Sequence, residues 1–154
     1  PDKGLVLMGW GKLEGDLRLL VAQEKLEDQV YFVPPVSQEV LLKWSSSADV
    51  GVIPYRAMSL NNYYSCPNKL FEYICAGTSV AGSAFPEIQK IVEGWALGHT
   101  FDPEQPTSIA EAITKILASP EGHQAMRQQS NKARQVLNWT TQGEKLLDIY
   151  MSLA

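Results

Sequence analysis

The 154-residue sequence predicts an α/β fold, a doubly wound parallel sheet followed by a helical C-terminal tail. Three observations support this prediction. Short apolar runs alternate with segments of helical periodicity, each apolar run ends in turn-forming residues, and the last third of the chain has helical periodicity alone. The run from Val50 to Pro54 is continuously apolar, which is typical of a parallel strand covered on both faces.

Taken in order, the apolar runs predict strands at residues 5–8, 30–33, 50–54, 78–81 and about 100–101. Helices are expected around Leu17 to Val21, from a cap at Ser37, at 68–76, from Pro86 to near Gly94, and at 107–118, 121–137 and 142–153. Residues 55–67 form an unusually long connection, which indicates a functional or mobile loop. We interpret residues 1–154 as one domain, a βα core over 1–104 followed by C-terminal helices over 105–154.

Composition excludes several classes of protein. A hydrophobic fraction of 45% and a charged fraction of 19% argue against disorder, and the apolar runs are too short to span a membrane. The net charge of −4 argues against a broad nucleic-acid surface. Cys66 and Cys75 are too few for a disulfide framework, favour a cytoplasmic location, and are interpreted as core or loop fillers. The two histidines lack neighbours at ligand spacing, so no metal is expected.

The helix at 68–76 carries the most informative pattern. Asn68 is the expected N-cap, and Gly77 closes the helix where a left-handed turn is needed. The spacing divides the helix into a core face and an outward face. The core face is Leu70, Phe71, Ile74 and Cys75, and the outward face is Lys69, Glu72, Tyr73 and Ala76.

Ligands of doubly wound sheets bind beyond the carboxyl ends of the strands. The long loop and the start of the 68–76 helix both lie at that edge, so we expect a phosphate and ribose site there. Gly9 and Gly11 lie at the same edge, but GWG is far short of a dinucleotide fingerprint and indicates a tight turn.

The order of motifs resembles a known family. The motifs are LVLMGWG, VYFVPPV, SSADVGVIPY, PNKLFEYICAGTSVAGS, FPEI and HTFDPEQPTSIAEAI. Together they resemble the C-terminal, donor-binding domain of the GT-B glycosyltransferases, in the large retaining group often called family 4. The resemblance covers nearly the whole chain and implies a Rossmann-like domain that forms one half of a two-domain enzyme.

The resemblance implies roles for individual residues. Glu72 matches the acid that binds the ribose hydroxyls, and a carboxylate suits a diol because it offers two acceptor oxygens. Many members carry another Glu eight residues earlier, in an E-x7-E pattern, where this chain has Tyr64. Asn61, Asn62, Tyr63 or Tyr64 is therefore expected to contact the donor sugar instead, and the sequence does not single out one of them.

The start of the same helix is expected to hold the diphosphate. Lys69 and the amides of Asn68 and Lys69 lie at its positive end, where departing charge can be stabilised without a metal or other cofactor. Pro34 and Pro35 match the loop that packs against the nucleotide base. The residues alone leave simpler interpretations open, since Glu72 and Lys69 suit a solvated helix face and the two tyrosines suit loop packing.

The predicted function is the donor-binding half of a retaining glycosyltransferase. It would move a sugar from a UDP-sugar, or less favourably a GDP-sugar, to a saccharide or lipid-linked acceptor. The alternatives are a nucleotide-sugar epimerase of the same fold and a noncatalytic nucleotide-sugar-binding module. The family's first strand and helix of this domain precede the LVLMGWG strand, and no match to them is found here. At the place of that first strand we expect an unfilled position, a rearranged sheet or a partner chain. We also expect an N-terminal domain of the same enzyme as partner, peripheral membrane association through the full enzyme, and little activity from this chain alone.

Overall fold

The computed structural model describes residues 3–153 and contains two compact units. The first extends to Leu41 and the second begins at Leu42, so the boundary falls within helix α2 (Gln38–Ser47). Each unit is described by itself. Within the described residues, no helix is long and apolar enough to cross a membrane.

The first unit is built on a pair of parallel strands. Strands β1 (Leu5–Met8) and β2 (Val30–Val33) pair in register from Leu5 opposite Val30 to Met8 opposite Val33. Helix α1 (Glu14–Gln23) connects them and has no buried residue. Arg18 of α1 lies over the ring of Phe32, 4.2 Å from its centre, so the helix contacts β2 through a cation–π interaction.

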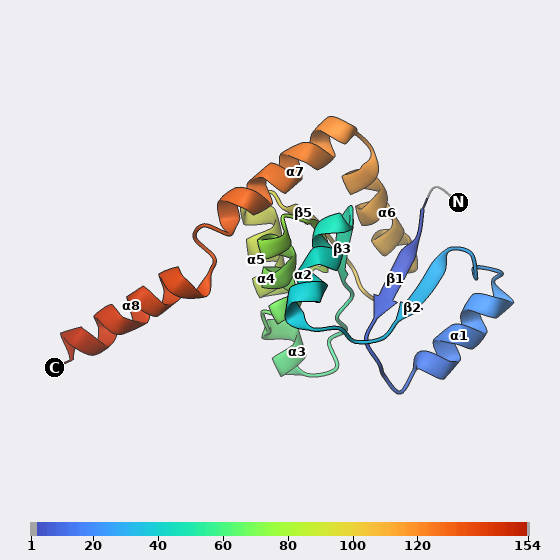
Figure 1. Cartoon of the computed structure of the whole chain (residues 1–154), viewed down its shortest axis with the longest axis horizontal. Helices are drawn as coiled ribbons and strands as arrows, with labels where there is room; N and C mark the ends of the chain where they lie inside the picture. Colours follow the sequence, from blue (N-terminus) through green and yellow to red (C-terminus); the bar gives the residue numbers. More distant parts are fainter. Residues whose placement is uncertain (1–2, 154) are drawn as a thin grey trace. The chain divides into compact units, whose positions relative to one another are not determined.

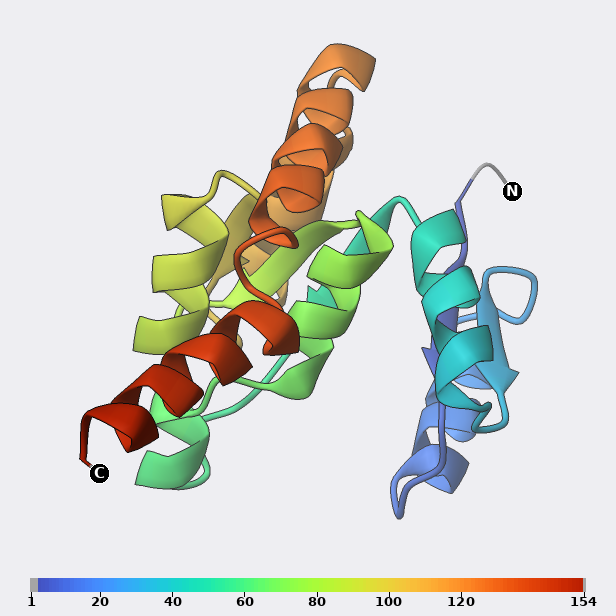
Figure 2. The same ribbon diagram turned by 60° about the vertical axis from the view of Figure 1, so that its left-hand side comes forward.

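The second unit holds a three-stranded parallel sheet in the order β3-β4-β5 (Figures 1 and 2). The strands are β3 (Val50–Ile53), β4 (Ser79–Ser83) and β5 (Gly98–Phe101). The helices are α3 (Leu60–Tyr64), α4 (Asn68–Ala76), α5 (Pro86–Gly94), α6 (Pro106–Leu117), α7 (Pro120–Ala133) and α8 (Trp139–Ser152). Each strand-to-strand connection is helical, as parallel pairing requires.

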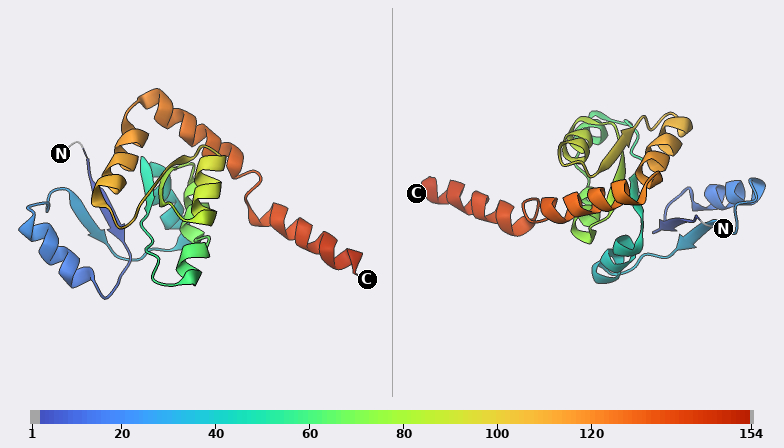
Figure 3. Two further views of the ribbon diagram at one scale, coloured as in Figure 1. Left: turned by 180° about the vertical axis from the view of Figure 1, so that it is seen from behind. Right: turned by 90° about the horizontal axis from the view of Figure 1, so that it is seen from above.

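Alternate residues of the strands face two separate apolar clusters. Ile53 and Val80 face α4 and α5 in one cluster, and Ala81 and Phe101 face α6 in the other. Figure 3 shows α5 and α6 on opposite sides of the second unit's sheet. The sheet is therefore covered on both faces, which explains the continuous apolar character of its strands.

Two glycines allow the helices and strands to approach closely. A Cβ on Gly82 would lie 2.7 Å from Cγ2 of Ile88 in α5, and one on Gly98 would lie 1.9 Å from the backbone oxygen of Val80. Both positions exclude a larger residue because the neighbouring atoms belong to the core or to the backbone.

The carboxyl ends of β3 and β4 are joined by the buried side chain of Ser83. Its hydroxyl lies 3.0 Å from the carbonyl oxygen of Ile53 and 2.7 Å from that of Tyr55, and donates its one proton to this pair. The chain leaving β3 is thereby fixed at its first residues.

The predicted α/β class and the parallel strands are confirmed, and the observed strands and predicted helices lie close to the expected bounds. Within the described residues, β1 pairs only with β2 and β3 pairs only with β4, and the expectation for the place of the family's first strand stays a prediction. The single-domain interpretation of residues 1–154, with its division at residue 104, stays a prediction.

The predicted faces of α4 were partly wrong. Cys75 is exposed and is not a core filler, whereas Tyr73 packs against the apolar cluster. The cause is Gly51 in β3, whose missing side chain leaves space for an aromatic ring; a Cβ there would lie 2.5 Å from Tyr73. The burial of Tyr73, with the neighbouring Glu72 carboxylate, raises the pKa of its phenol.

A prediction concerns the two buried serines of β4. The hydroxyl of Ser79 is fully buried and has no hydrogen-bond partner among the described residues. Ser79→Ala removes this desolvated group, so we expect the free energy of unfolding to stay unchanged or to rise by up to ~1 kcal/mol. Hydrogen exchange of the β4 amides in the full-length protein measures this value.

Ser83→Ala is the matched comparison, because it deletes the same group from the other end of the same strand. We expect it to destabilise β4 by about 1–3 kcal/mol, since two carbonyl groups lose their donor. Equal losses in both variants would contradict the assignment of Ser79 as unpartnered.

Candidate functional site

Six of the eight predicted site residues lie in the second unit, on α3 and α4, which follow the carboxyl end of β3. The segment from residue 54 to 67 leaves β3, forms the short helix α3, and enters α4 at Asn68. All six residues therefore lie on one connection, the one between β3 and β4. The turn after β5, residues 102–105, lies at the same edge because the strands are parallel.

Helix α3 was not predicted, and its capping explains why it forms inside the long loop. The hydroxyl of Ser59 accepts a hydrogen bond from the backbone N–H of Asn62 at 3.2 Å and donates to Oδ1 of Asn62 at 2.8 Å. Ser65 then donates to the backbone oxygen of Asn62 at 3.0 Å. Asn62 thus stabilises the short helix through its bonds to Ser59 and Ser65. The expected contact of its side chain with the donor sugar stays a prediction.

The two adjacent tyrosines of α3 lie in different environments. Tyr63 is half-buried, packs against Phe85 with ring centres 5.1 Å apart, and meets Tyr64 edge to face at 4.9 Å. The side chain of Tyr64, at the position of the family's first acid, is 59% exposed. Tyr63 therefore anchors the segment to the core, and Tyr64 is the more accessible of the two to a ligand.

The N-cap of α4 is Pro67 and not Asn68, which corrects the prediction. Pro67 is buried in an extended conformation, with φ −74° and ψ 145°, and its carbonyl accepts from the backbone N–H of Leu70 at 3.0 Å. The ring of proline fixes a φ that suits this cap, so the helix begins at Asn68. Within the described residues, the backbone amides of Asn68 and Lys69 have no acceptor, and they remain available to an anion.

Lys69 and Glu72 occupy neighbouring turns of α4. They are three residues apart, so their side chains lie on adjacent positions of one helix surface. Lys69 is exposed and Glu72 is half-buried. In the part of the chain that the structure describes, neither side chain makes a hydrogen bond or an ion pair, so both are free to bind a ligand.

Pro34 and Pro35 follow β2 and are exposed. They belong to the first unit, whereas Asn62, Tyr63, Tyr64, Asn68, Lys69 and Glu72 belong to the second. Their expected position beside the nucleotide base stays a prediction.

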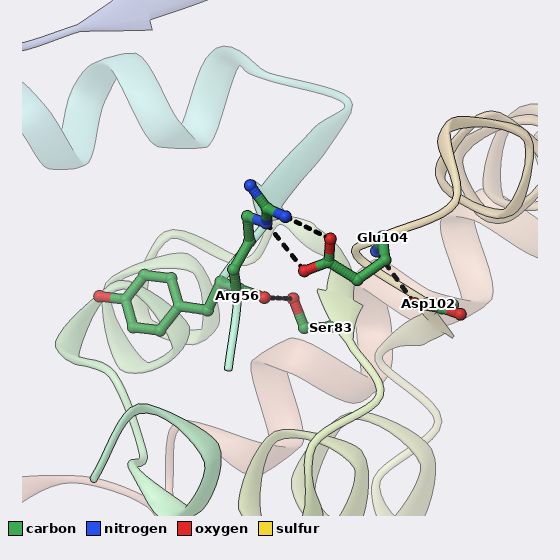
Figure 4. A network of polar contacts seen from close by, with 5 residues as sticks. Arg56, Ser83, Asp102 and Glu104 are labelled. Atoms are coloured by element: carbon green, nitrogen blue, oxygen red, sulfur yellow. Dashed lines mark hydrogen bonds and ion pairs between the residues drawn. The ribbon is translucent and has the colours of Figure 1, made fainter. Parts of the chain in front are cut away.

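An ion pair that the sequence reasoning missed lies at the same edge (Figure 4). Arg56, which follows the end of β3 after Pro54 and Tyr55, donates from Nε to Oε1 of Glu104 at 2.8 Å and from Nη2 to Oε2. Arg56 holds the pKa of the Glu104 carboxyl below its usual range, chiefly through these hydrogen bonds. The sequence signal that could have indicated this ion pair is a basic residue after β3 and an acidic residue after β5, since both strands belong to one parallel sheet.

Comparisons with known proteins identify the family of the chain. Residues 2–119, which include every candidate residue, match the family model described as "Glycosyl transferases group 1". The chain is 25% identical to a D-inositol 3-phosphate glycosyltransferase from Thermomonospora curvata and 27% identical to the amylovoran biosynthesis glycosyltransferase AmsK from Erwinia amylovora. These alignments cover 92% and 72% of this chain but only 31% and 26% of the relatives.

Solved structures show the same architecture. The sucrose-phosphate synthase from Thermosynechococcus elongatus superimposes with a TM-score of 0.78 at 26% identity, over 97% of this chain and 38% of that structure. WaaG, a glycosyltransferase involved in lipopolysaccharide biosynthesis, superimposes with a TM-score of 0.72 at 17% identity, over 95% of this chain and 37% of that structure, and supports the fold alone. The chain thus spans from 26% to 38% of the length of these proteins. By its family match and its GT-B architecture, the chain belongs to the group 1 glycosyltransferases.

Proposed function

We propose that this chain is the donor-binding part of a longer retaining glycosyltransferase that uses a nucleotide diphosphate sugar, with UDP favoured over GDP. The observation that carries the proposal is the start of α4, where two backbone amides, Lys69 and Glu72 are all without partners among the described residues. Such a combination suits a ligand with an anionic group next to a diol.

In this proposal, the diphosphate lies at the first turn of α4. The amides of Asn68 and Lys69 and the positive end of the helix dipole attract the phosphates, and the ammonium group of Lys69 adds a full charge. Negative charge accumulates on the diphosphate as the sugar leaves, so these groups would bind the transition state more strongly than the ground state. The same groups would serve without a metal or other cofactor.

Glu72 would accept hydrogen bonds from both ribose hydroxyls one turn further along the helix. Tyr64 and Asn62 would then lie toward the donor sugar, and Pro34 and Pro35 would contact the base. We assign no protein nucleophile, and catalysis would depend on positioning and charge stabilisation between this part and the acceptor-binding domain.

Two names among the relatives support the class of acceptor, an amylovoran biosynthesis glycosyltransferase and a putative teichuronic acid biosynthesis glycosyltransferase. The relatives named D-inositol 3-phosphate glycosyltransferase carry the name of a different, non-saccharide acceptor. We propose a saccharide or lipid-linked acceptor of a cell-surface polysaccharide pathway, and a cytoplasmic location. Incubating the full-length protein with candidate donors and acceptors, followed by mass spectrometry, separates transfer from epimerised donor and from binding without reaction.

The ribose assignment predicts a specific loss of affinity. In the full-length protein, Glu72→Ala should raise the Kd of UDP by about 10- to 100-fold, which corresponds to the loss of roughly 1.4–2.8 kcal/mol of charge-assisted hydrogen bonding. The variant should also bind UDP and 2′-deoxy-UDP equally, because the wild-type preference depends on the carboxylate. Isothermal titration of both nucleotides measures these values.

Glu111→Gln is the control, since Glu111 is an exposed carboxylate of α6, the helix that covers the opposite face of the sheet. It should bind both nucleotides as the wild type does. Unchanged affinity of Glu72→Ala for UDP and for GDP would overturn the ribose assignment.

The diphosphate assignment predicts transfer without a divalent ion. Activity of the full-length enzyme should survive EDTA, whereas Lys69→Gln should lower kcat by about 10- to 100-fold through loss of a charge-assisted hydrogen bond to the leaving group. Lys115→Gln on α6 is the matched control and should retain activity. Loss of transfer in EDTA, with recovery in Mg²⁺ or Mn²⁺, would contradict this assignment.

A further inference from the structure

The segment from residue 54 to 67 carries all four candidate donor-sugar contacts, yet few interactions fix it to the rest of its unit. Its own hydrogen bonds, between Ser59, Asn62 and Ser65, are internal. Met58 and Leu60 are 80% and 77% exposed, so the middle of the segment has little apolar anchorage. Only Tyr55, Tyr63 and Cys66 pack against the apolar cluster.

The polar contacts of the segment with other elements are correspondingly few. Ser83 bonds the carbonyl of Tyr55 at the very start. Beyond that point, the pair of Arg56 with Glu104 is the one side-chain polar contact between residues 56–65 and any other part of the described chain. The two residues are 48 positions apart in the sequence, so the ion pair can form only when the tertiary fold brings them together.

The acceptor of this pair is held in place by its own turn. The backbone N–H of Glu104 donates to Oδ1 of Asp102 at 2.9 Å, and the backbone N–H of Asp102 donates to the hydroxyl of Ser108 in the first turn of α6 at 3.1 Å. The turn that carries Glu104 is therefore hydrogen-bonded to Asp102 at the end of β5, as Figure 4 shows, and through Asp102 to Ser108 at the start of α6.

The geometry of the pair favours a defined position for the segment. Two nitrogens of the guanidinium bond two oxygens of one carboxylate, and this fork fixes orientation as well as distance. Both side chains are more than half exposed, at 61% and 51%, so the contact is open to solvent and sensitive to salt.

We propose that the Arg56–Glu104 ion pair is a latch that fixes the start of the 54–67 segment to the β5–α6 turn and thereby positions the donor-sugar contacts on α3. Arg56 and Glu104 act here as positioning residues. The expected effect on donor kinetics rests on the proposed function. The effect of the latch on the conformational order of residues 54–67 does not.

The test compares Arg56→Gln, Glu104→Gln and the exchanged pair Arg56→Glu with Glu104→Arg in the full-length protein. Two readouts are used: hydrogen exchange of the amides of residues 56–65, and steady-state kinetics with varied UDP-sugar. We expect each single variant to speed amide exchange by about two- to fivefold, the range for loss of an exposed ion pair, and the exchanged pair to restore it. The donor KM should rise by a similar factor with kcat lowered less.

Glu14→Gln is the matched control, because it breaks another exposed Arg–Glu pair, with Arg18 in α1. It should leave exchange in residues 56–65 unchanged. Wild-type exchange rates in both single variants, or failure of the exchanged pair to slow exchange, would overturn the latch. Altered exchange together with a wild-type enzyme that binds neither UDP nor GDP would support the latch and contradict the proposed function.

Discussion

The burial of strand β4 is the constraint on which the second unit depends. All five of its residues are buried, and four of them are small, so helices pack closely against both faces. The absent side chain of Gly82 admits Ile88 of α5, and Ala81 packs with Ile116 of α6. Because close-packed interiors tolerate little change in volume, β4 fixes the positions of the helices that surround it. The start of α4, where the proposed donor site lies, is positioned by the same packing, since Leu70 and Ile74 belong to the cluster around Val80.

At the carboxyl edge of the sheet, some polar groups are paired within the fold and others have no partner among the described residues. The hydroxyl of Ser83 is hydrogen-bonded to the carbonyl oxygens of Ile53 and Tyr55, and Arg56 forms an ion pair with Glu104. The amides of Asn68 and Lys69 and the side chain of Glu72 have no partner among the described residues. Unsatisfied donors and acceptors are costly when desolvated, so they are retained where a ligand or water can satisfy them. This contrast within one edge is the physical argument for placing the nucleotide at α4.

Much of the fold could be predicted because its signals are local. Apolar runs and helical spacing located the five strands and most of the helices, and the turn-forming Gly77 marked the end of α4. The remaining features depend on contacts distant in sequence. Tyr73 packs inward in the space left by Gly51, which the periodicity of α4 alone cannot show, and Arg56 meets Glu104 only after three strands have aligned. Helix α3 was missed because a helix of five residues is too short to show periodicity in the sequence. Ser59, a typical N-cap residue, was the local signal that could have indicated it.

The first unit buries little apolar surface of its own. A parallel pair of two short strands is marginal by itself, and here Leu5, Val6 and Tyr31 remain about half exposed. The helix between the strands has no buried residue, so little apolar surface within the unit is removed from water. Pro34 and Pro35, the exposed prolines after β2, therefore lie at the end of a strand pair that has few stabilising contacts of its own. Because a nucleotide base is bound well only by a preorganised surface, base recognition would require this unit to be stabilised by further parts of the enzyme, and diphosphate binding at α4 would not.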